Sequence, residues 1–260
     1  MGWLGLAYLG SLLLLFINAF WQRDAFTGLI IRDFTLENFN RLTNPTFISV
    51  TLRTLGMAAA VTLTCAVLAF PIAYYMARVA SPRLKAALVI AVLMPLWASY
   101  VIKIYAWRQI FSEQGVLNWA LEPIGLRGPG YSEIALWAVF TYLWLPYMIL
   151  PVFAGLERIP SSVLEASADL GARGTTTLRR VVLPLAFPAV VAGSIFTFAL
   201  TLGDYIAPNL ITSQQFIGNL IYSRFGVPDL PGAAALSLVP LAIVVAYLLI
   251  ARRLGAFEAL

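Results

Sequence analysis

The sequence predicts an all-α integral membrane protein with six transmembrane helices. Its 260 residues are 61% hydrophobic and only 11% charged, whereas soluble domains carry about 25% charged residues, so the chain lacks the polar surface of a water-soluble globule. Six apolar stretches approach the roughly 20 residues that a helix needs to cross a bilayer. These stretches are continuous runs of Leu, Ala, Val and Ile, which favours helices over the alternating strands of a transmembrane barrel.

Short connections join the six predicted spans and leave no room for a soluble catalytic domain. The spans are residues 3–20, 54–76, 85–107, 133–156, 184–202 and 232–251. Proline interrupts five of them, at Pro71, Pro95, Pro146, Pro151, Pro188 and Pro240. Because proline removes a backbone hydrogen bond, it kinks a helix, and kinked spans are typical of a moving transport pathway.

The basic residues indicate the side of the membrane on which each loop lies. With the N-terminus in the cytoplasm, nine Lys and Arg residues fall in cytoplasmic segments and six in extracytoplasmic ones. The segment 77–84 and the tail after Ala251 are basic and adjoin the membrane, where the positive-inside rule is strongest. We therefore expect both termini to be cytoplasmic.

Several classes of chemistry are excluded by residue types that the sequence lacks. It has no histidine and a single cysteine, Cys65, which excludes Ser-His-Asp triads, HExxH sites, disulfide frameworks and cysteine-cluster metal sites. We expect no metal site and no nucleic-acid partner. A phosphate-binding GxxxxGK[ST] loop is also absent, because the two lysines, Lys85 and Lys103, follow Leu84 and Ile102.

The segment 157–188, between the fourth and fifth spans, is longer than a connection between two helices needs to be. Ser162 and Glu165 have the spacing of a capping box, which predicts a helix from Val163 to Leu170. Gly171 follows at the position where a glycine ends a helix in the left-handed conformation.

A second helix is predicted over residues 177–183, with Thr175 or Thr176 as its cap and Pro184 as its end. We expect the two helices to form a compact helix-turn-helix on the cytoplasmic face, with Ala166 and Ser167 pointing outward. The apolar residues expected to pack between them are Leu164, Ala168, Leu170, Leu178 and Val182.

This segment resembles the EAA loop of the permease subunits of binding-protein-dependent ABC importers. The family pattern is Glu-Ala-Ala, three residues, Gly, nine residues and Ile-x-Leu-Pro. The chain has Glu165-Ala166-Ser167, three residues, Gly171, nine residues and Val181-Val182-Leu183-Pro184. The spacing matches throughout, and the two substitutions, Ser for Ala and Val for Ile, conserve size. The resemblance covers roughly residues 45–250.

The resemblance implies the MetI-like fold of ABC importer permeases and a function for the loop. Residues 1–44 would form the first transmembrane helix and an extracytoplasmic loop, and residues 45–255 the permease transmembrane domain, with a coupling loop at 157–184. A coupling helix of this family sits in a groove of a cytoplasmic ATPase. The residues implied in that coupling are Glu165, Ala166, Ser167, Asp169, Gly171, Leu183 and Pro184.

The resemblance also implies the rest of the transporter. Its partners would be a dimer of ATP-binding cassette ATPases, a second homologous permease subunit and an extracytoplasmic solute-binding protein. ATP would be bound by the ATPase, so this chain would need no cofactor and would not be an enzyme. It would lie among lipids of the bacterial cytoplasmic (inner) membrane.

Two stretches, residues 95–118 and 200–211, resemble spermidine/putrescine permeases. The string Leu202-Gly203-Asp204-Tyr205 is similar to the first of the two permease subunits in those systems. A polyamine is therefore the expected solute, and permeases for opines, aminoethylphosphonate and other small solutes remain the alternative. A secondary transporter is the alternative of another class, and it predicts intramembrane acids without a structured cytoplasmic loop.

Asp204, at the end of the fifth span, is the candidate for holding a diammonium solute, because a carboxylate and aromatic faces attract cations. The candidate aromatic residues of the pathway are Tyr205, Trp97, Tyr100, Tyr142 and Trp144. The alternatives are an interfacial belt for the aromatics and helix capping or subunit pairing for Asp204. We expect Lys103 to snorkel or to pair with an acid, and residues 213–225 to form an amphipathic helix at the outer interface.

Overall fold

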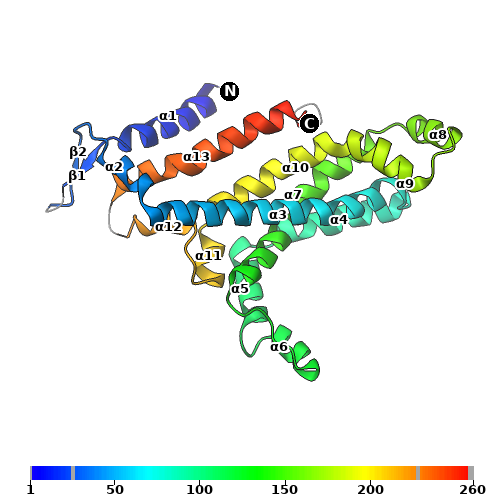
Figure 1. Cartoon of the computed structure of the whole chain (residues 1–260), viewed down its shortest axis with the longest axis horizontal. Coiled ribbons are helices and arrows are strands. Elements are labelled where there is room, and N and C mark those ends of the chain that lie inside the picture. The colour runs from blue at the N-terminus through cyan, green and yellow to red at the C-terminus, as the bar shows by residue number, and fades with distance from the viewer. Residues whose placement is uncertain (1, 25–26, 227–228, 257–260) are drawn as a thin grey trace.

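The computed structural model describes residues 2–24, 27–226 and 229–256. The long helices form an elongated bundle, from which a side arm projects (Figure 1). The helices α3 (Pro45–Arg78), α7 (Glu133–Glu157) and α10 (Leu183–Gly203) pack against one another, α13 (Leu230–Arg253) packs on α10, and α1 (Gly2–Asn18) packs on α13. The predicted all-α class is therefore confirmed.

Shorter elements occupy the two ends of the bundle and the arm. One end, the hairpin end, holds β1 (Gln22–Arg23) antiparallel to β2 (Ile30–Ile31), α2 (Glu37–Asn40), the 3₁₀ turn Arg41–Thr43 and α12 (Ile217–Ser223). The opposite end, the loop end, holds α8 (Ser161–Asp169) and α9 (Gly174–Thr177). The helix α4 (Pro82–Trp97) leads into the arm, which consists of α5 (Tyr100–Phe111), α6 (Val116–Leu121) and the 3₁₀ turn Glu122–Ile124, and α11 (Ile206–Ile211) contacts α5.

The predicted count of six membrane spans is not confirmed. Within the described residues, four helices are long and apolar enough to cross a bilayer: α3, α7, the continuous helix Gly174–Gly203 and α13. The pair α4 and α5 makes a fifth if it counts as one span. The first predicted span, 3–20, corresponds to α1, which ends at Asn18 and whose apolar part, Gly5–Asn18, is shorter than the four spanning helices.

The third predicted span, 85–107, is not continuous, and this prediction is wrong. The helix α4 ends at Trp97, α5 begins at Tyr100, and the two are bent by 91°. Ala98 and Ser99 have extended backbone conformations, with ψ angles of 144° and 129°. Apolar composition alone gives no sign of this break, because hydrophobic residues continue on both sides of it.

Lys103 stabilises the break. In a continuous helix the carbonyl of Pro95 would accept from the amide of Ser99, but the chain is no longer helical there. The Lys103 Nζ donates to this carbonyl at 3.0 Å instead. A cation at a helix C-terminus is also favoured by the helix dipole. We expected Lys103 to snorkel or to pair with an acid; among the described residues it pairs with a backbone carbonyl instead.

The core lies where α3, α7 and α10 meet. Two glycines allow close packing of α7 against α10, as small residues do between membrane helices. A Cβ atom at Gly193 would come within 2.8 Å of the Met148 Sδ, and one at Gly155 would collide with the Cβ of Ala189.

The predicted helix within 213–225 is confirmed as α12, and its expected position at the membrane interface stays a prediction. Ile217 is fully buried and packs with Phe47 of α3 and Leu236 of α13. In addition, the amide of Ile217 donates to the Thr54 Oγ1 at 2.9 Å. The apolar side of α12 therefore serves the protein core.

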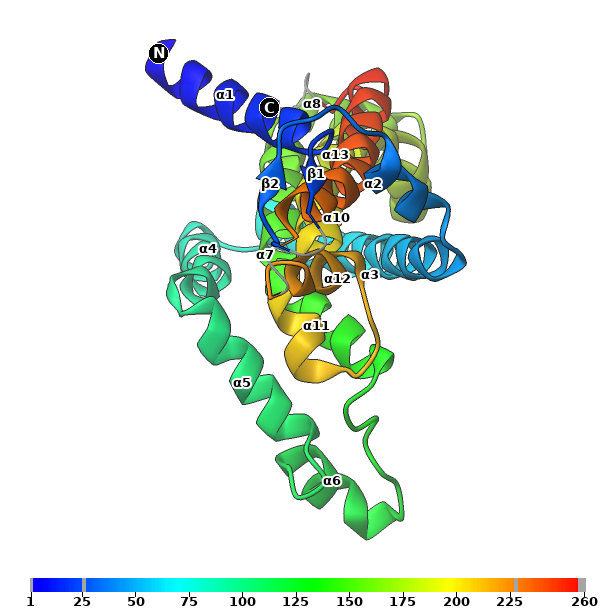
Figure 2. The ribbon, with the colours of Figure 1, turned by 90° about the vertical axis from the view of Figure 1, so that its left-hand side faces the viewer.

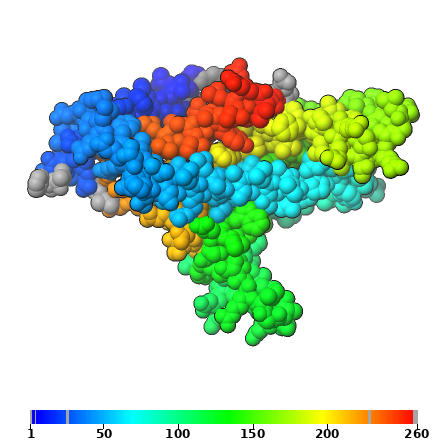
Figure 3. All heavy atoms as spheres, viewed as in Figure 1, coloured from blue at the N-terminus to red at the C-terminus, as the bar shows by residue number. Residues whose placement is uncertain are grey.

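The arm of α5 and α6 extends away from the bundle. Figure 2 shows α5 and α6 leaving the body together, and the space-filling view shows their surface standing apart from it (Figure 3). The buried residues of α5 are Ile104 and Phe111, whereas no residue of α6 is buried. Its outer part exposes large apolar side chains, among them Val116 and Trp119.

Candidate functional site

The loop end contains the segment that carries the EAA pattern. Its first helix, α8, begins at Ser161, two residues before the predicted start. The predicted capping box is wrong: the N-cap residue is Pro160, and in this described segment no side-chain hydrogen bond caps the helix. Pro160 can take this place because its fixed φ angle of −63° suits the start of a helix.

The end of α8 follows the prediction. Gly171 has a φ angle of +76°, the left-handed conformation that glycine adopts without strain. The amide of Gly171 donates to the carbonyl of Ala168 at 2.8 Å, and the amide of Ala172 donates to the carbonyl of Ser167 at 3.1 Å. This pair of bonds is a Schellman motif, so the turn after α8 is closed by backbone contacts alone.

The second helix of the loop differs from the prediction. It begins at Gly174, after an extended Arg173, and is not capped by Thr175 or Thr176 within this described segment. It then continues through a π-helical turn, Leu178–Val182, into α10. Pro184 therefore does not end the helix, because it lies in the first turn of α10, directly after the wider π turn.

The base of the loop is fastened to the bundle from α3 and α4. Arg78, the last residue of α3, donates through its Nη2 to the carbonyls of Leu156 and, at 2.6 Å, Ile159. The Lys85 Nζ of α4 forms an ion pair with the Glu157 carboxylate at 2.7 Å. A guanidinium on the final carbonyls of α7 replaces hydrogen bonds that the helix end lacks. From the sequence alone, Arg78 and Lys85 are only two of the basic residues expected on the cytoplasmic side of the membrane.

The interior of the loop is continuous with the core. Ile159 and Val182 are buried in the same cluster as the residues of α3 and α7, and Leu164 and Leu178 pack against it. The expected packing of these two leucines is therefore confirmed. Ser167 was expected to point outward, but its hydroxyl lies 2.9 Å from that of Thr177 and joins α8 to α9.

The outer surface of α8 holds the remaining residues of the EAA pattern. Glu165, Ala166, Ala168, Asp169 and Gly171 are exposed, as are Leu183 and Pro184 farther along. Ala168 and Leu170 were expected to pack inward, and this is wrong: both are exposed, and Leu170 is 88% exposed. Leu170 lines an open hollow of about 600 Å³ between the end of α8 and the start of the next helix, with Ser167, Thr176 and Arg180 among the other lining residues.

A second group of candidate residues surrounds Asp204, at the junction of α10 and α11. The Oδ1 of Asp204 accepts the amides of Ile206 and Ala207 at 2.9 and 3.0 Å. Its Oδ2 accepts the hydroxyl of Tyr100, from the first turn of α5. The carboxylate therefore caps the beginning of α11 and also links α5 to α10, two segments that are 104 residues apart.

Aromatic rings extend from this carboxylate into the bundle. The ring of Tyr100 stacks on Trp144 of α7, with centroids 5.9 Å apart. Trp144 in turn contacts Tyr147 edge to face, at 6.0 Å, and Tyr147 stacks on Phe196 of α10, at 6.3 Å. The Trp144 Nε1 is buried and makes no hydrogen bond among the described residues. Asp204, Tyr100 and Trp144 thus form one site, which we call the Asp204 cluster.

The other predicted aromatic residues lie elsewhere. Trp97 is 84% exposed at the end of α4. Tyr142 packs against Trp107 of α5, with centroids 5.3 Å apart, and Tyr205 stacks on Tyr222 of α12, at 4.4 Å. Trp97, Tyr142 and Tyr205 are therefore not part of the stack of rings beside Asp204, and their place on the pathway stays a prediction.

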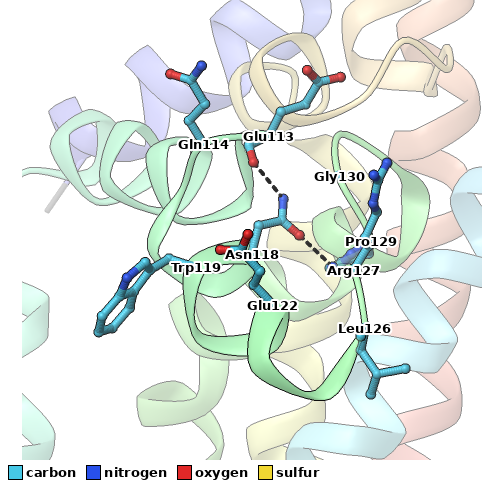
Figure 4. Close-up of a pocket in the computed structure, with 11 residues that line it drawn as sticks. Glu113, Gln114, Asn118, Trp119, Glu122, Leu126, Arg127, Pro129 and Gly130 are labelled. Atoms are coloured by element: carbon cyan, nitrogen blue, oxygen red, sulfur yellow. Dashed lines mark hydrogen bonds between the residues drawn. The ribbon is translucent and has the colours of Figure 1, made fainter.

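The tip of the arm contains an open hollow of about 940 Å³ (Figure 4). Asn118 holds it together: its Nδ2 donates to the carbonyl of Glu113 at 3.2 Å, and its Oδ1 accepts the amide of Gly128 at 2.7 Å. Figure 4 shows the side chains of Trp119 and Glu113 directed away from each other. These contacts brace the loop that returns from α6 to α7.

The described residues form a bundle of membrane-spanning helices, and a packed helical loop at one end is fastened to the ends of α3, α4 and α7. This is the architecture of the membrane subunit of a transporter. The model of the family described as "Binding-protein-dependent transport system inner membrane component" matches residues 69–257. The chain belongs to this family. It is a multi-pass permease subunit of an ABC importer in the inner membrane, and not an enzyme.

Individual relatives agree with this assignment. The chain is 49% identical to the inner membrane ABC transporter permease protein YdcU of Escherichia coli (strain K12), over 99% of this chain and 88% of that protein. It is 30% identical to the spermidine/putrescine transport system permease protein PotB of the same organism, over 91% and 88%. A solved bacterial ABC transporter that imports the acidic polysaccharide alginate shares the fold, with a TM-score of 0.72 at 20% identity, over 95% of this chain and 91% of that one.

Proposed function

We propose that this subunit forms half of the translocation pathway for a polyamine, spermidine or putrescine, and that the Asp204 cluster lies on that pathway. The observation that carries the proposal is the partly buried carboxylate of Asp204 beside the rings of Tyr100 and Trp144. A carboxylate with aromatic faces recognises an alkylammonium group by charge and by cation–π attraction. The 30% identity to the spermidine/putrescine permease PotB supports the same class of solute.

The coupling loop 157–184 docks into the cytoplasmic ATPase. Its outer face offers a carboxylate, Glu165, beside the small side chain of Ala166, which permits close approach of a partner surface. Leu170 adds an apolar contact that is 88% exposed in the isolated subunit. Asp169 and Gly171 flank it, and the fastening by Arg78 and by the Lys85–Glu157 pair makes the loop stiff enough to transmit movement into α7 and α10.

Three kinds of partner complete the transporter. An ATPase dimer binds and hydrolyses ATP, a second homologous permease subunit forms the other half of the pathway, and an extracytoplasmic binding protein delivers the solute. The 39% identity over 114 residues to the spermidine/putrescine transport system permease protein PotC of Escherichia coli (strain K12) fits a second, homologous subunit. A solved alginate ABC transporter in complex with its substrate-bound periplasmic protein has a related fold, with a TM-score of 0.72 at 18% identity.

The loop end faces the cytoplasm of a bacterial cell in this proposal, with both termini on the same side and the hairpin end outside. The basic residues near the loop end support this orientation, since Arg78, Lys85, Arg179 and Arg180 lie close to the membrane there. An opine or aminoethylphosphonate is the alternative solute. A phosphonate is disfavoured by the carboxylate of Asp204, which would repel it.

The substrate proposal is tested by the solute that activates the complete transporter. The permease pair and the ATPase are reconstituted in nanodiscs with the cognate binding protein, and ATP hydrolysis is measured with spermidine, putrescine, octopine or 2-aminoethylphosphonate. Spermidine or putrescine should raise hydrolysis above the solute-free rate, because only the loaded binding protein engages the permeases. Stimulation by octopine or the phosphonate alone would contradict the polyamine proposal and leave the permease assignment standing.

A further inference from the structure

Two polar side chains of α5 hold it at its angle to the bundle. Tyr100 and Lys103, one turn apart on the same face of α5, reach to different neighbours. The Tyr100 hydroxyl donates to the Asp204 carboxylate between α10 and α11. The Lys103 Nζ donates to the Pro95 carbonyl of α4 across the break, at 3.0 Å. One contact thus fixes α5 to the fifth span, and the other fixes the 91° bend itself.

We propose that Tyr100 and Lys103 form a latch that keeps α5 bent while the pathway is empty, and that an ammonium group of the solute opens it by taking the Oδ2 of Asp204 from the Tyr100 hydroxyl. The proposal rests on the proposed function in one respect, namely that the solute is a cation. It adds a residue, Tyr100, that competes with the solute, and a hinge, residues 98–99, that responds to it.

The two carboxylate oxygens of Asp204 accept hydrogen bonds from different partners. Oδ1 is held by the amides of Ile206 and Ala207, at 2.9 and 3.0 Å, and remains in place when the solute enters. Oδ2 is bound by one phenol only among the described residues. A hydrogen bond between an ammonium and a carboxylate is charge-assisted on both sides and stronger than one from a neutral phenol. An alkylammonium therefore displaces the Tyr100 hydroxyl without disturbing the cap of α11.

The contacts that remain after release define the movement. α5 stays attached to α7 through the packing of Trp107 on Tyr142, and its residues Ile104 and Phe111 belong to the buried core cluster. The break at residues 98–99 has non-helical backbone, and the Ser99 carbonyl accepts the amide of Lys103 at 3.1 Å within α5, so this bond moves together with α5. Release therefore changes the angle between α4 and α5 rather than detaching α5. The arm amplifies this change, since α6 lies beyond the far end of α5 (Figure 2).

The angle is measured by electron–electron distances between two spin labels in the complete transporter. Cys65 is replaced by Ala, and labels are attached to Q114C, in the turn between α5 and α6, and to V67C on α3, two exposed positions. Without solute, Tyr100→Phe should shift the distance distribution away from that of the parent, because it removes the hydroxyl and keeps the ring on Trp144. Tyr105→Phe, a half-exposed tyrosine of the same helix, should leave the distribution unchanged.

Binding protein loaded with spermidine should move the parent distribution towards that of Tyr100→Phe. In uptake assays, Tyr100→Phe should lower the KM for spermidine by up to about tenfold. This variant lacks the hydroxyl that competes with the solute for the Asp204 carboxylate, and that contact is worth one hydrogen bond to a charged group. A purely structural role of Tyr100 predicts a higher KM or a lower kcat instead. A solute-free distribution of Tyr100→Phe that coincides with that of the parent would overturn the latch.

Lys103 gives an independent test. Lys103→Met should shift the solute-free distribution in the same way, whereas Lys103→Arg, which retains a donor for the Pro95 carbonyl, should restore the parent distribution. Equal distributions for Lys103→Met and the parent would also contradict the latch. If Tyr100→Phe shifts the arm and spermidine is not transported, the latch stands and the polyamine proposal fails. If spermidine is transported and the arm does not move, the latch fails and the polyamine proposal stands.

Discussion

Replacing Leu170 with aspartate should abolish ATP-driven uptake and release the ATPase from the permease. Leu170 is 88% exposed in the isolated chain, so the fold should tolerate the change within about 0.5 kcal/mol. In the docking that we propose, the side chain is buried against the ATPase, where a leucine would contribute about 1.5–3 kcal/mol and an aspartate would place an unpaired charge in the interface. The ATPase retained on affinity-purified permease should fall at least tenfold, together with the uptake rate.

Leu254→Asp is the matched control for this prediction. Leu254 follows α13, is 45% exposed, and lies outside the coupling loop. This variant should retain ATPase binding and uptake close to those of the wild type. Normal ATPase retention by Leu170→Asp would exclude Leu170 from the docking surface.

Replacing Asp204 with asparagine should raise the KM for spermidine by about tenfold or more. The amide oxygen of asparagine can still accept the amides of Ile206 and Ala207, so the cap of α11 is kept. What is lost is the negative charge, and a hydrogen bond to a charged group is worth about 1.5–3 kcal/mol, or roughly 10- to 150-fold in affinity. The measurement is the initial rate of uptake of labelled spermidine as a function of the concentration of spermidine-loaded binding protein.

Asp33→Asn provides the same chemical change at an exposed carboxylate that follows β2. It should leave the uptake curve unchanged. If the curves of Asp204→Asn and the wild type coincide, Asp204 does not lie on the pathway, and its carboxylate serves only to cap α11.

Local patterns predicted the parts of the coupling loop that local forces determine. Gly171 ends α8 because a left-handed residue is required there, and glycine adopts that conformation without strain. Leu164 and Leu178 pack inward as their spacing indicates. Leu170 could not be placed in this way, because it lies in the turn after α8, where helical spacing no longer applies, and apolar character alone predicts burial.

The long-range contacts of the site could not be predicted from the sequence. The spacing of Tyr100 and Asp204 in the chain gives no sign that they meet, and their contact depends on the 91° bend between α4 and α5. The bend interrupts a run of apolar residues, for which composition predicts a single span. Arg78 was interpreted as a topogenic charge, since nothing local reveals that its guanidinium reaches the carbonyls of Leu156 and Ile159.

The central claim is that this chain conducts a polyamine only when a separate ATPase drives it through the coupling loop. The most direct test is uptake of labelled spermidine into proteoliposomes that contain the permease pair and the ATPase, with spermidine-loaded binding protein outside. Spermidine should accumulate when ATP is enclosed in the lumen, and accumulation should cease when ATP is replaced by a non-hydrolysable analogue. Accumulation that proceeds equally without ATP hydrolysis would show that the ATPase does not drive transport through this chain.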